Sequence, residues 1–302
     1  MRIYKDDKVL NIGDTNLPCP SIRGINGVIT PTLCFGQILI CYCVDKTIHS
    51  KSDTIRAFSL LWSQTSDDMV ATGARLVAKD RMIHIQLREG KLLPYGRIDK
   101  ETERWVPLPS FKYNNSFPIE AIYPNGTTYS LEEDKHFITL HSYYSKDICL
   151  QKLTFDEKHL LTGVRFDYEY LGEGLEKRFK LEAKYVGFDY QLGKITTGTK
   201  YHKQSCIQLP ELILNNPDDP LKFEKHEHDS VENQFIAIRT TDLVKDAGQT
   251  TIPYFDLLEV TTNPNIPLTG IELFHKGKSD GTSGGYVALK IYPMNLTTYM
   301  DG

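Results

Sequence analysis

Apolar and polar residues alternate over short segments along much of this 302-residue chain. Between residues 82 and 88, for example, Ile83, Ile85 and Leu87 share one face and polar residues occupy the other. A β-strand with one buried face requires this period of two. No stretch shows a sustained 3.6-residue period with caps, so we expect little helix.

One short phrase occurs three times with small changes. Ala-Thr-Gly-Ala-Arg-Leu occupies residues 71–76, Leu-Thr-Gly-Val-Arg-Phe residues 161–166, and Leu-Thr-Gly-Ile-Glu-Leu residues 268–273. A turn and a second alternating segment follow each phrase, so each copy predicts a β-hairpin. A phrase that recurs along a chain indicates a fold assembled from copies of one supersecondary unit.

The repeats predict an all-β protein whose three sheets form a β-prism-like unit with pseudo-threefold internal repeats. We expect the repeats near residues 67–110, 155–200 and 264–295, within a domain of residues 67–302. A leader that contains Cys, Pro and short strands occupies residues 1–66. A β-sandwich is the alternative, whereas β-trefoil repeats are much shorter than these.

The phrase also predicts which side chains are buried. Gly73, Gly163 and Gly270 should lie at a bulge or a sharp strand entry, because glycine permits a close approach of another chain. Period-two alternation then directs six residues into one shared core: Ala74, Leu76, Val164, Phe166, Ile271 and Leu273.

Charged residues occupy the outward position between these core residues. They are Arg75, Arg165 and Glu272. Such charges can pair across an interface between repeats, but a solvated strand face is the favoured interpretation.

Composition and charge exclude several classes of protein. Hydrophobic residues make up 40% and charged residues 25% of the chain, which describes a globular protein. A net charge of −4 offers no basic face, so no nucleic-acid partner is expected. No segment approaches the roughly 20 apolar residues that cross a bilayer, so we expect no membrane span.

The cysteines and the N-terminus bear on localisation in opposite ways. The charged start, Met-Arg-Ile-Tyr-Lys-Asp-Asp-Lys, has no apolar region of the kind found in a signal peptide. Four of the six cysteines, Cys19, Cys34, Cys41 and Cys43, lie near the N-terminus. In an exported protein they would suggest disulfides that fasten this arm to the body. Buried free thiols are the alternative.

Longer phrases resemble those of a known family. They are residues 70–94, Arg-Trp-Val-Pro-Leu at residues 104–108, residues 246–256, residues 267–270 and residues 274–277. Over roughly residues 34–292 the chain resembles an arthropod family of extracellular proteins known only as a domain of unknown function. The resemblance implies an extracellular location and no assigned activity. Family members typically carry a signal peptide and a long helical region ahead of this part, and neither is in this sequence.

Three N-glycosylation acceptor sequences begin at Asn114, Asn125 and Asn295. Such triplets also arise by chance. They matter only if the chain enters the secretory pathway, as the resemblance implies.

The glycine-rich loop at residues 276–285 is the best candidate for a ligand site. It resembles the loops with which jacalin-like β-prism lectins present backbone amides and an aspartate to a sugar. Asp280, Ser283, Gly284 and Gly285 supply donors and acceptors, and glycine lets a ligand approach the backbone. An ordinary hairpin tip is the alternative.

Evidence for catalysis or metal binding is weak. His226 and His228 could hold zinc, but residues two apart converge only in an extended segment, and a solvated loop is favoured. No nucleophile elbow, phosphate loop or zinc-protease motif is present, so we expect no catalytic residue and no cofactor. We therefore expect a non-enzymatic binding module for glycans or a cell-surface glycoprotein. The alternative is a structural or protein-interaction domain without sugar binding.

Overall fold

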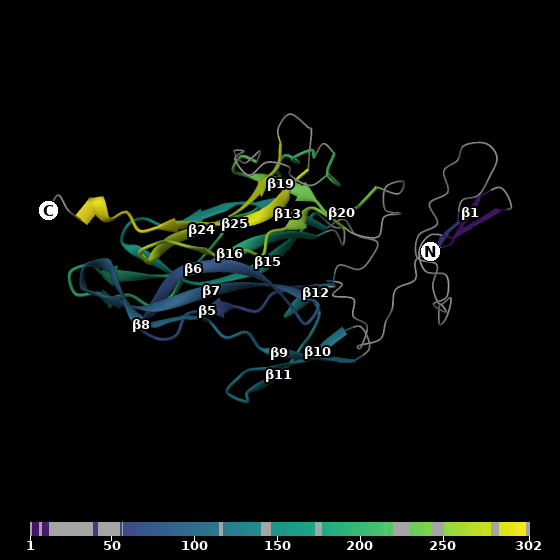
Figure 1. Ribbon diagram of the computed structural model, residues 1–302. Coiled ribbons are helices and arrows are strands. Elements are labelled where there is room, and N and C mark those ends of the chain that lie inside the picture. The colour runs from purple at the N-terminus through teal and green to yellow at the C-terminus, as the bar shows by residue number, and fades with distance from the viewer. Residues whose placement is uncertain are drawn as a thin grey trace. The chain divides into compact units, whose positions relative to one another are not determined.

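The computed structural model describes residues 2–5, 8–11, 39–41, 55, 57–114, 117–139, 146–172, 177–214, 216–219, 230–242, 251–278 and 284–299. The chain divides into two compact units, Met1–Asp53 and Thr54–Gly302. Regular structure in the described part consists of β-strands and two short 3₁₀ helices, which confirms the prediction of an all-β protein (Figure 1). Within the same residues, no helix is both long and apolar enough to cross a membrane.

The smaller unit contains one antiparallel sheet in the order β2-β1-β3. Its strands are β1 (Arg2–Lys5), β2 (Lys8–Asn11) and β3 (Leu39–Cys41). Cys19, Cys34 and Cys43 lie outside the described residues. The disulfides expected in this arm therefore stay a prediction.

Three long antiparallel hairpins build the larger unit, one from each repeated phrase. They pair β6 (Met69–Lys79) with β7 (Met82–Leu93), β15 (His159–Tyr170) with β16 (Lys177–Asp189), and β24 (Leu268–Lys276) with β25 (Tyr286–Pro293). In each hairpin the register shifts just before the glycine of the phrase. The bulges expected at Gly73, Gly163 and Gly270 are therefore confirmed.

A close approach of a neighbouring strand explains two of these glycines. A Cβ atom on Gly270 would lie 2.5 Å from the Leu153 carbonyl oxygen in β14 (Lys152–Thr154). On Gly73 it would lie 3.0 Å from the Val260 carbonyl oxygen in β23 (Val260–Thr261). Any other residue would push these strands away from the hairpins.

Short strands extend each hairpin into a sheet. The first sheet adds β4 (Ala57–Ser59), β8 (Arg97–Trp105), β12 (Phe137–Thr139) and β23. The second adds β5 (Ser63–Gln64), β13 (Lys146–Leu150), β17 (Lys194–Ile195), β18 (Lys200–Lys203) and β19 (Gln234–Ala237). The third adds β14 and β22 (Tyr254–Phe255). Two smaller sheets consist of β9 (Ser110–Asn114), β10 (Phe117–Ile122) and β11 (Thr128–Ser130), and of β20 (Arg239–Thr240) and β21 (Thr251–Ile252).

The boundary between the units lies earlier than the leader expected from the sequence. Residues 54–66 belong to the larger unit and not to a leader that ends at residue 66. The reason is pairing, since β4 joins β7 and β5 joins β15. This pairing buries Ala57 and Phe58 of β4 in the larger unit.

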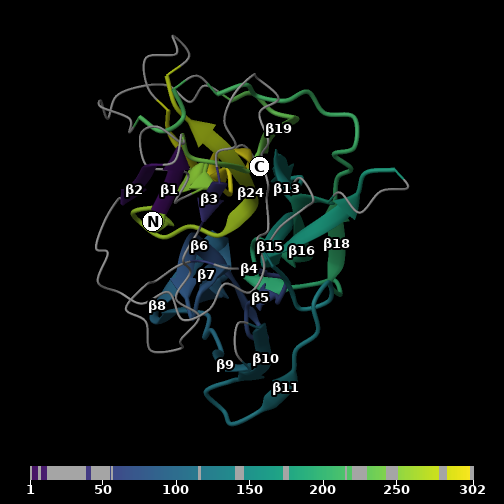
Figure 2. The ribbon, with the colours of Figure 1, turned by 90° about the vertical axis from the view of Figure 1, so that its right-hand side faces the viewer.

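One hydrophobic cluster connects the three hairpins, which face one another in Figure 2. It contains all six predicted core residues: Ala74, Leu76, Val164, Phe166, Ile271 and Leu273. This prediction is confirmed. Phe58 in β4 lies in the same cluster, and its ring centroid is 5.1 Å from that of Phe166 and 4.7 Å from that of Phe179.

Candidate functional site

Several predicted site residues lie outside the part of the chain that the structure describes. They are Asp280 and Ser283 of the glycine-rich loop and the two histidines, His226 and His228. Their predicted roles stay predictions. Among the described residues, no group of three or more His, Cys, Asp or Glu side chains is arranged to hold a metal.

Gly284 and Gly285, the two glycines predicted to bind a ligand in this loop, are buried against the chain itself. A Cβ atom on Gly284 would lie 2.4 Å from the Pro217 carbonyl oxygen. On Gly285 it would lie 1.8 Å from the Lys276 carbonyl oxygen. The close backbone approach that glycine permits is therefore taken by the protein's own main chain. This packing explains both glycines without a ligand.

The outward charged residues of the three phrases contact polar partners in their own hairpins, and Arg75 also forms an ion pair with Glu259, outside its hairpin, at 3.8 Å. The contacts join Arg75 Nε to Gln86 Oε1 at 2.9 Å, Arg165 Nη2 to Glu182 Oε2 at 2.6 Å, and Lys290 Nζ to Glu272 Oε2 at 3.7 Å. Arg75 also lies over the ring of Trp105 at 4.1 Å, and Arg165 over that of Trp62 at 4.7 Å. The three charged residues therefore lie in partly covered polar networks. This differs from both interpretations of the sequence, a solvated strand face and pairing between repeats.

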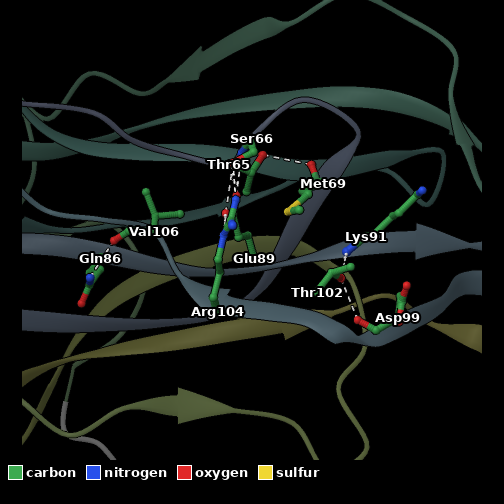
Figure 3. Close-up of polar contacts among 10 residues, drawn as sticks. All are labelled: Thr65, Ser66, Met69, Gln86, Glu89, Lys91, Asp99, Thr102, Arg104 and Val106. Atoms are coloured by element: carbon green, nitrogen blue, oxygen red, sulfur yellow. Dashed lines mark hydrogen bonds and ion pairs between the residues drawn. The ribbon is translucent and has the colours of Figure 1, made fainter. Parts of the chain in front are cut away.

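A buried carboxylate, Glu89 of β7, is the centre of a further polar network (Figure 3). Its Oε2 accepts a hydrogen bond from the Ser66 amide at 2.6 Å, and its Oε1 accepts one from Arg104 Nε at 2.8 Å. The Ser66 hydroxyl donates to Oε1 as well, at 3.1 Å. Donors on both oxygens hold the carboxylate as a structural ion pair that joins β7, β8 and the turn before β6. The sequence held a signal for it, because period-two alternation continues the buried face of Leu87 to Glu89.

His84 of β7 is a buried titratable group. Its ring stacks on Phe111 with centroids 5.1 Å apart, and its Nε2 has no hydrogen-bond partner among the described residues. Burial lowers the pKa of His84 to about 4 from 6.5, and this outweighs a backbone hydrogen bond with Lys79 that raises the pKa. The folded protein therefore keeps the imidazole neutral through mildly acidic pH.

This shift predicts a pH-dependent stability. Between pH 6.5 and about 4 the unfolded chain takes up a proton at His84 that the folded chain does not. The free energy of unfolding should fall over this window by up to about 3 kcal/mol because of this residue. His84→Leu should remove that part of the pH dependence, measured by urea unfolding of both proteins at pH 6.5 and pH 4.5. Equal pH dependence in the two proteins would contradict the prediction.

Three turns meet at one end of the larger unit (Figure 1). They are η1 (Pro94–Gly96) after β7, residues 190–193 after β16, and η2 (Leu296–Tyr299) after β25. The Tyr95 amide donates a hydrogen bond to the Tyr190 carbonyl oxygen at 2.7 Å, which ties the first two turns together. Each turn follows the second strand of one repeated hairpin, so the repeats bring three distant parts of the sequence to one place.

Two glycines with positive φ let these turns pack tightly. Gly193 has φ +61°, and a Cβ atom there would lie 2.1 Å from the Leu93 carbonyl carbon. Gly96 has φ +67°, and a Cβ atom there would lie 2.3 Å from Met294 Cε in the segment before η2. Neither position has room for a side chain, so the three turns form one interlocked surface.

Tyrosine side chains dominate this surface, and we call Tyr95, Tyr190 and Tyr299 the tyrosine array. The Tyr190 and Tyr299 rings are stacked with centroids 4.0 Å apart, and Tyr95 meets Tyr190 edge to face at 5.9 Å. Tyr95 is 60% exposed, and Leu192 in the second turn is 59% exposed. Exposed tyrosines carried by loops are typical of recognition surfaces, because the ring is apolar and the hydroxyl is polar.

The backbone of Tyr95 is strained. Its φ of 63° and ψ of 34° place a bulky residue in the left-handed region that such residues avoid. Holding this conformation costs on the order of 1–3 kcal/mol, and such strain gathers at functional sites. The hydrogen bond to Tyr190 and the packing of Gly96 maintain it.

Tyr299 of the tyrosine array is uncharged at neutral pH, because its surroundings raise its pKa. Burial, and then the charges of Glu157 and Asp156, raise the pKa of Tyr299. The Tyr299 hydroxyl donates a hydrogen bond to the Glu157 carbonyl oxygen. The array can therefore offer ring faces and hydroxyl groups to a ligand, which suits stacking and hydrogen bonding. In the sequence, Pro-Tyr-Gly at residues 94–96 indicates a turn. No sequence pattern indicates that Tyr190 and Tyr299 lie beside it.

The chain has no match among protein-family models or among curated proteins.

Proposed function

We propose that this protein is a non-enzymatic binding module that recognises glycans or a cell-surface glycoprotein through the tyrosine array. The observation that carries the proposal is Tyr95, an exposed aromatic residue held in strained backbone where three turns meet. A tyrosine ring can stack on the C–H face of a sugar while its hydroxyl forms hydrogen bonds. Strain and exposure together favour a role in binding over a role in packing.

The architecture that we propose for this module is a β-prism with pseudo-threefold repeats. Its support is the plan of the three sheets. The second strand of each hairpin pairs in parallel with one short strand, namely β4, β13 or β22. The first strand of each hairpin pairs antiparallel with another, namely β23, β5 or β14. Three copies of one unit account for this agreement more simply than an irregular sandwich does.

An extracellular location is part of the proposal, as the resemblance to the arthropod family implies. A disulfide between Cys149 in β13 and Cys206 after β18 supports it. Both cysteines are fully buried. Disulfides persist in oxidising compartments and are rare in the cytosol. Nothing in the sequence singles out these two cysteines, because their separation of 57 residues carries no motif.

A glycan array tests the proposal. We expect the wild-type protein to bind at least one class of glycan and Tyr95→Ala to weaken that binding about tenfold, the effect of losing one stacking contact. Tyr129→Ala is the matched control, because Tyr129 is 55% exposed on β11, outside the tyrosine array. Asp280→Ala tests the glycine-rich loop in the same experiment.

Two outcomes would contradict this assignment. Absence of binding to every glycan would reject sugar recognition. Equal binding by the wild type and Tyr95→Ala would reject the tyrosine array as the site, and a loss with Asp280→Ala would then assign the site to the glycine-rich loop.

The alternative is a structural or protein-interaction domain without sugar binding. Leu192 favours it, because an exposed leucine in one of the three turns suits an apolar protein partner better than a sugar. Size-exclusion chromatography separates the two: a stable oligomer that Leu192→Asp disrupts, together with no glycan binding, would support the alternative. A monomer that binds glycan would reject it.

A further inference from the structure

The sheet of β9, β10 and β11 projects from the rest of the larger unit (Figures 1 and 2). Tyr-Pro-Asn-Gly-Thr at residues 123–127 makes its β10–β11 turn. The Gly126 amide donates a hydrogen bond to the Tyr123 carbonyl oxygen at 2.9 Å, and the Tyr123 amide donates one to the Thr127 carbonyl oxygen at 2.8 Å. Gly126 has φ +85°. This is a type I turn followed by a left-handed glycine, a common three-residue hairpin loop.

Asn125, the acceptor of a glycosylation triplet, lies at the exposed tip of this turn. Its Oδ1 accepts a hydrogen bond from the Thr127 amide at 3.0 Å. A Cβ atom on Gly126 would have no atom within 4 Å, so the space beside the asparagine is open. The turn therefore presents the side chain of Asn125 to a transferase without local unfolding.

An aromatic residue, Tyr123, stands two positions before this asparagine at the base of the same turn. Thr127, which binds the Asn125 carboxamide, is also the residue hydrogen-bonded to Tyr123 across the base of the turn. The bond from the Thr127 amide therefore holds the Asn125 carboxamide at this turn. The Tyr123 ring is partly buried and meets the Tyr129 ring edge to face, with centroids 5.7 Å apart. Burial, and then Tyr129, raise the pKa of Tyr123, so the ring stays neutral.

We propose that Asn125 carries an N-linked glycan whose first N-acetylglucosamine packs on the ring of Tyr123. In the transfer, Asn125 Nδ2 forms a bond to C1 of the sugar, and the bond from C1 to the pyrophosphate oxygen of a lipid-linked oligosaccharide breaks. The lipid pyrophosphate leaves, and one amide proton passes to solvent. The apolar face of the sugar then covers the ring, which stabilises the projecting sheet.

The other two triplets have no aromatic residue two positions before the asparagine. Asn295 is also exposed, and its Oδ1 accepts hydrogen bonds from the Thr297 amide at 3.1 Å and the Thr297 hydroxyl at 2.7 Å. The residue two positions before it is Pro293, however, and the residue two positions before Asn114 is Lys112. The chain thus contains its own control for the effect of an aromatic neighbour.

The test uses the full chain, secreted from insect cells behind an appended leader peptide, with Asn114 and Asn295 replaced by Gln. Mass spectrometry should find a glycan on Asn125, and an amidase that removes N-glycans should release it. The glycosylated protein should melt about 2–4 °C above the Asn125→Gln variant, the shift that a single stacking contact gives a domain of this size. In a Tyr123→Ala background this difference should disappear, whereas Tyr123→Phe, which keeps the ring, should retain it.

An unmodified Asn125 in the secreted protein would overturn the proposal. An equal melting difference with and without the Tyr123 ring would overturn the contact with the sugar. Restoring Asn295 in place of Asn125 should give a glycan with no dependence on Tyr123. The outcome is independent of the proposed function, because none of these measurements involves binding of an external glycan.

Discussion

Replacing Phe166 with alanine should lower the free energy of unfolding by about 3–5 kcal/mol, the usual cost of removing a buried aromatic side chain. Phe166 is 1% exposed and lies in the cluster that all three hairpins share. Its ring meets Phe58 edge to face, and the Phe58 ring also lies against Phe179 and Phe255. The cavity would open where three sheets face one another, so no single strand can move to fill it. Urea unfolding monitored by circular dichroism measures the change.

Phe166→Leu is the matched control for this cavity. It keeps most of the apolar volume and should cost much less than the alanine variant. Tyr129→Ala, which removes an exposed aromatic on β11 and its edge-to-face contact with Tyr123, should cost no more than about 1.5 kcal/mol. A loss below 1 kcal/mol for Phe166→Ala would mean that the hairpins do not share one close-packed core.

Replacing Arg178 with methionine should also destabilise the protein by about 3–5 kcal/mol, the range for breaking a buried ion pair by removing one partner. Arg178 of β16 is buried, and its Nε lies 3.1 Å from Asp147 Oδ2 in β13. Its Nη1 donates to the carbonyl oxygens of Cys206 and Ile207 at 2.6 and 2.9 Å. The variant removes the cation that faces the carboxylate and two donors that hold the segment after β18. Unfolding should be measured without reductant, so that the disulfide at Cys206 stays intact.

A double variant separates the ion pair from the rest of the site. Arg178→Met with Asp147→Leu should recover part of the lost stability, because the carboxylate is no longer buried beside an apolar side chain. Arg178→Lys should not restore the wild type, since one ammonium group cannot replace a guanidinium whose Nε reaches the carboxylate while Nη1 reaches both carbonyl oxygens. If Arg178→Met unfolds at the urea concentration of the wild type, the pair contributes nothing to stability.

The sequence predicted the described fold class and core because both depend on local spacing. Period-two alternation placed Ala74, Val164 and Ile271 on the buried side of their strands. The glycine of each phrase predicted a bulge, since a residue without Cβ tolerates a close neighbour. The larger unit begins at Thr54, earlier than the sequence pattern suggested, because no local pattern shows that β4 and β5 pair with strands far along the chain.

The candidate site shows where local spacing stops being informative. Gly284 and Gly285 suggested a loop open to a ligand. The lack of a side chain, however, equally allows the chain's own backbone to approach closely, and this is what the structure shows. Which of the two applies depends on what lies opposite, and Pro217 is remote in the sequence. The pairing of Cys149 with Cys206 is likewise not predictable from the sequence, because spacing alone does not select which of the six cysteines pair.

By itself, the sequence determined that this protein is built from β-strands, that its repeated phrases form bulged hairpins, and which faces of those hairpins are buried. These properties follow from side-chain period and glycine geometry within a few residues. The tertiary structure alone decided that Tyr95, Tyr190 and Tyr299 form one surface and that Tyr95 is strained. These tyrosines meet because three turns, each after a different hairpin, pack against one another. The contacts that stabilise this packing join residues about 100 or more positions apart in the sequence, so no local pattern predicts them.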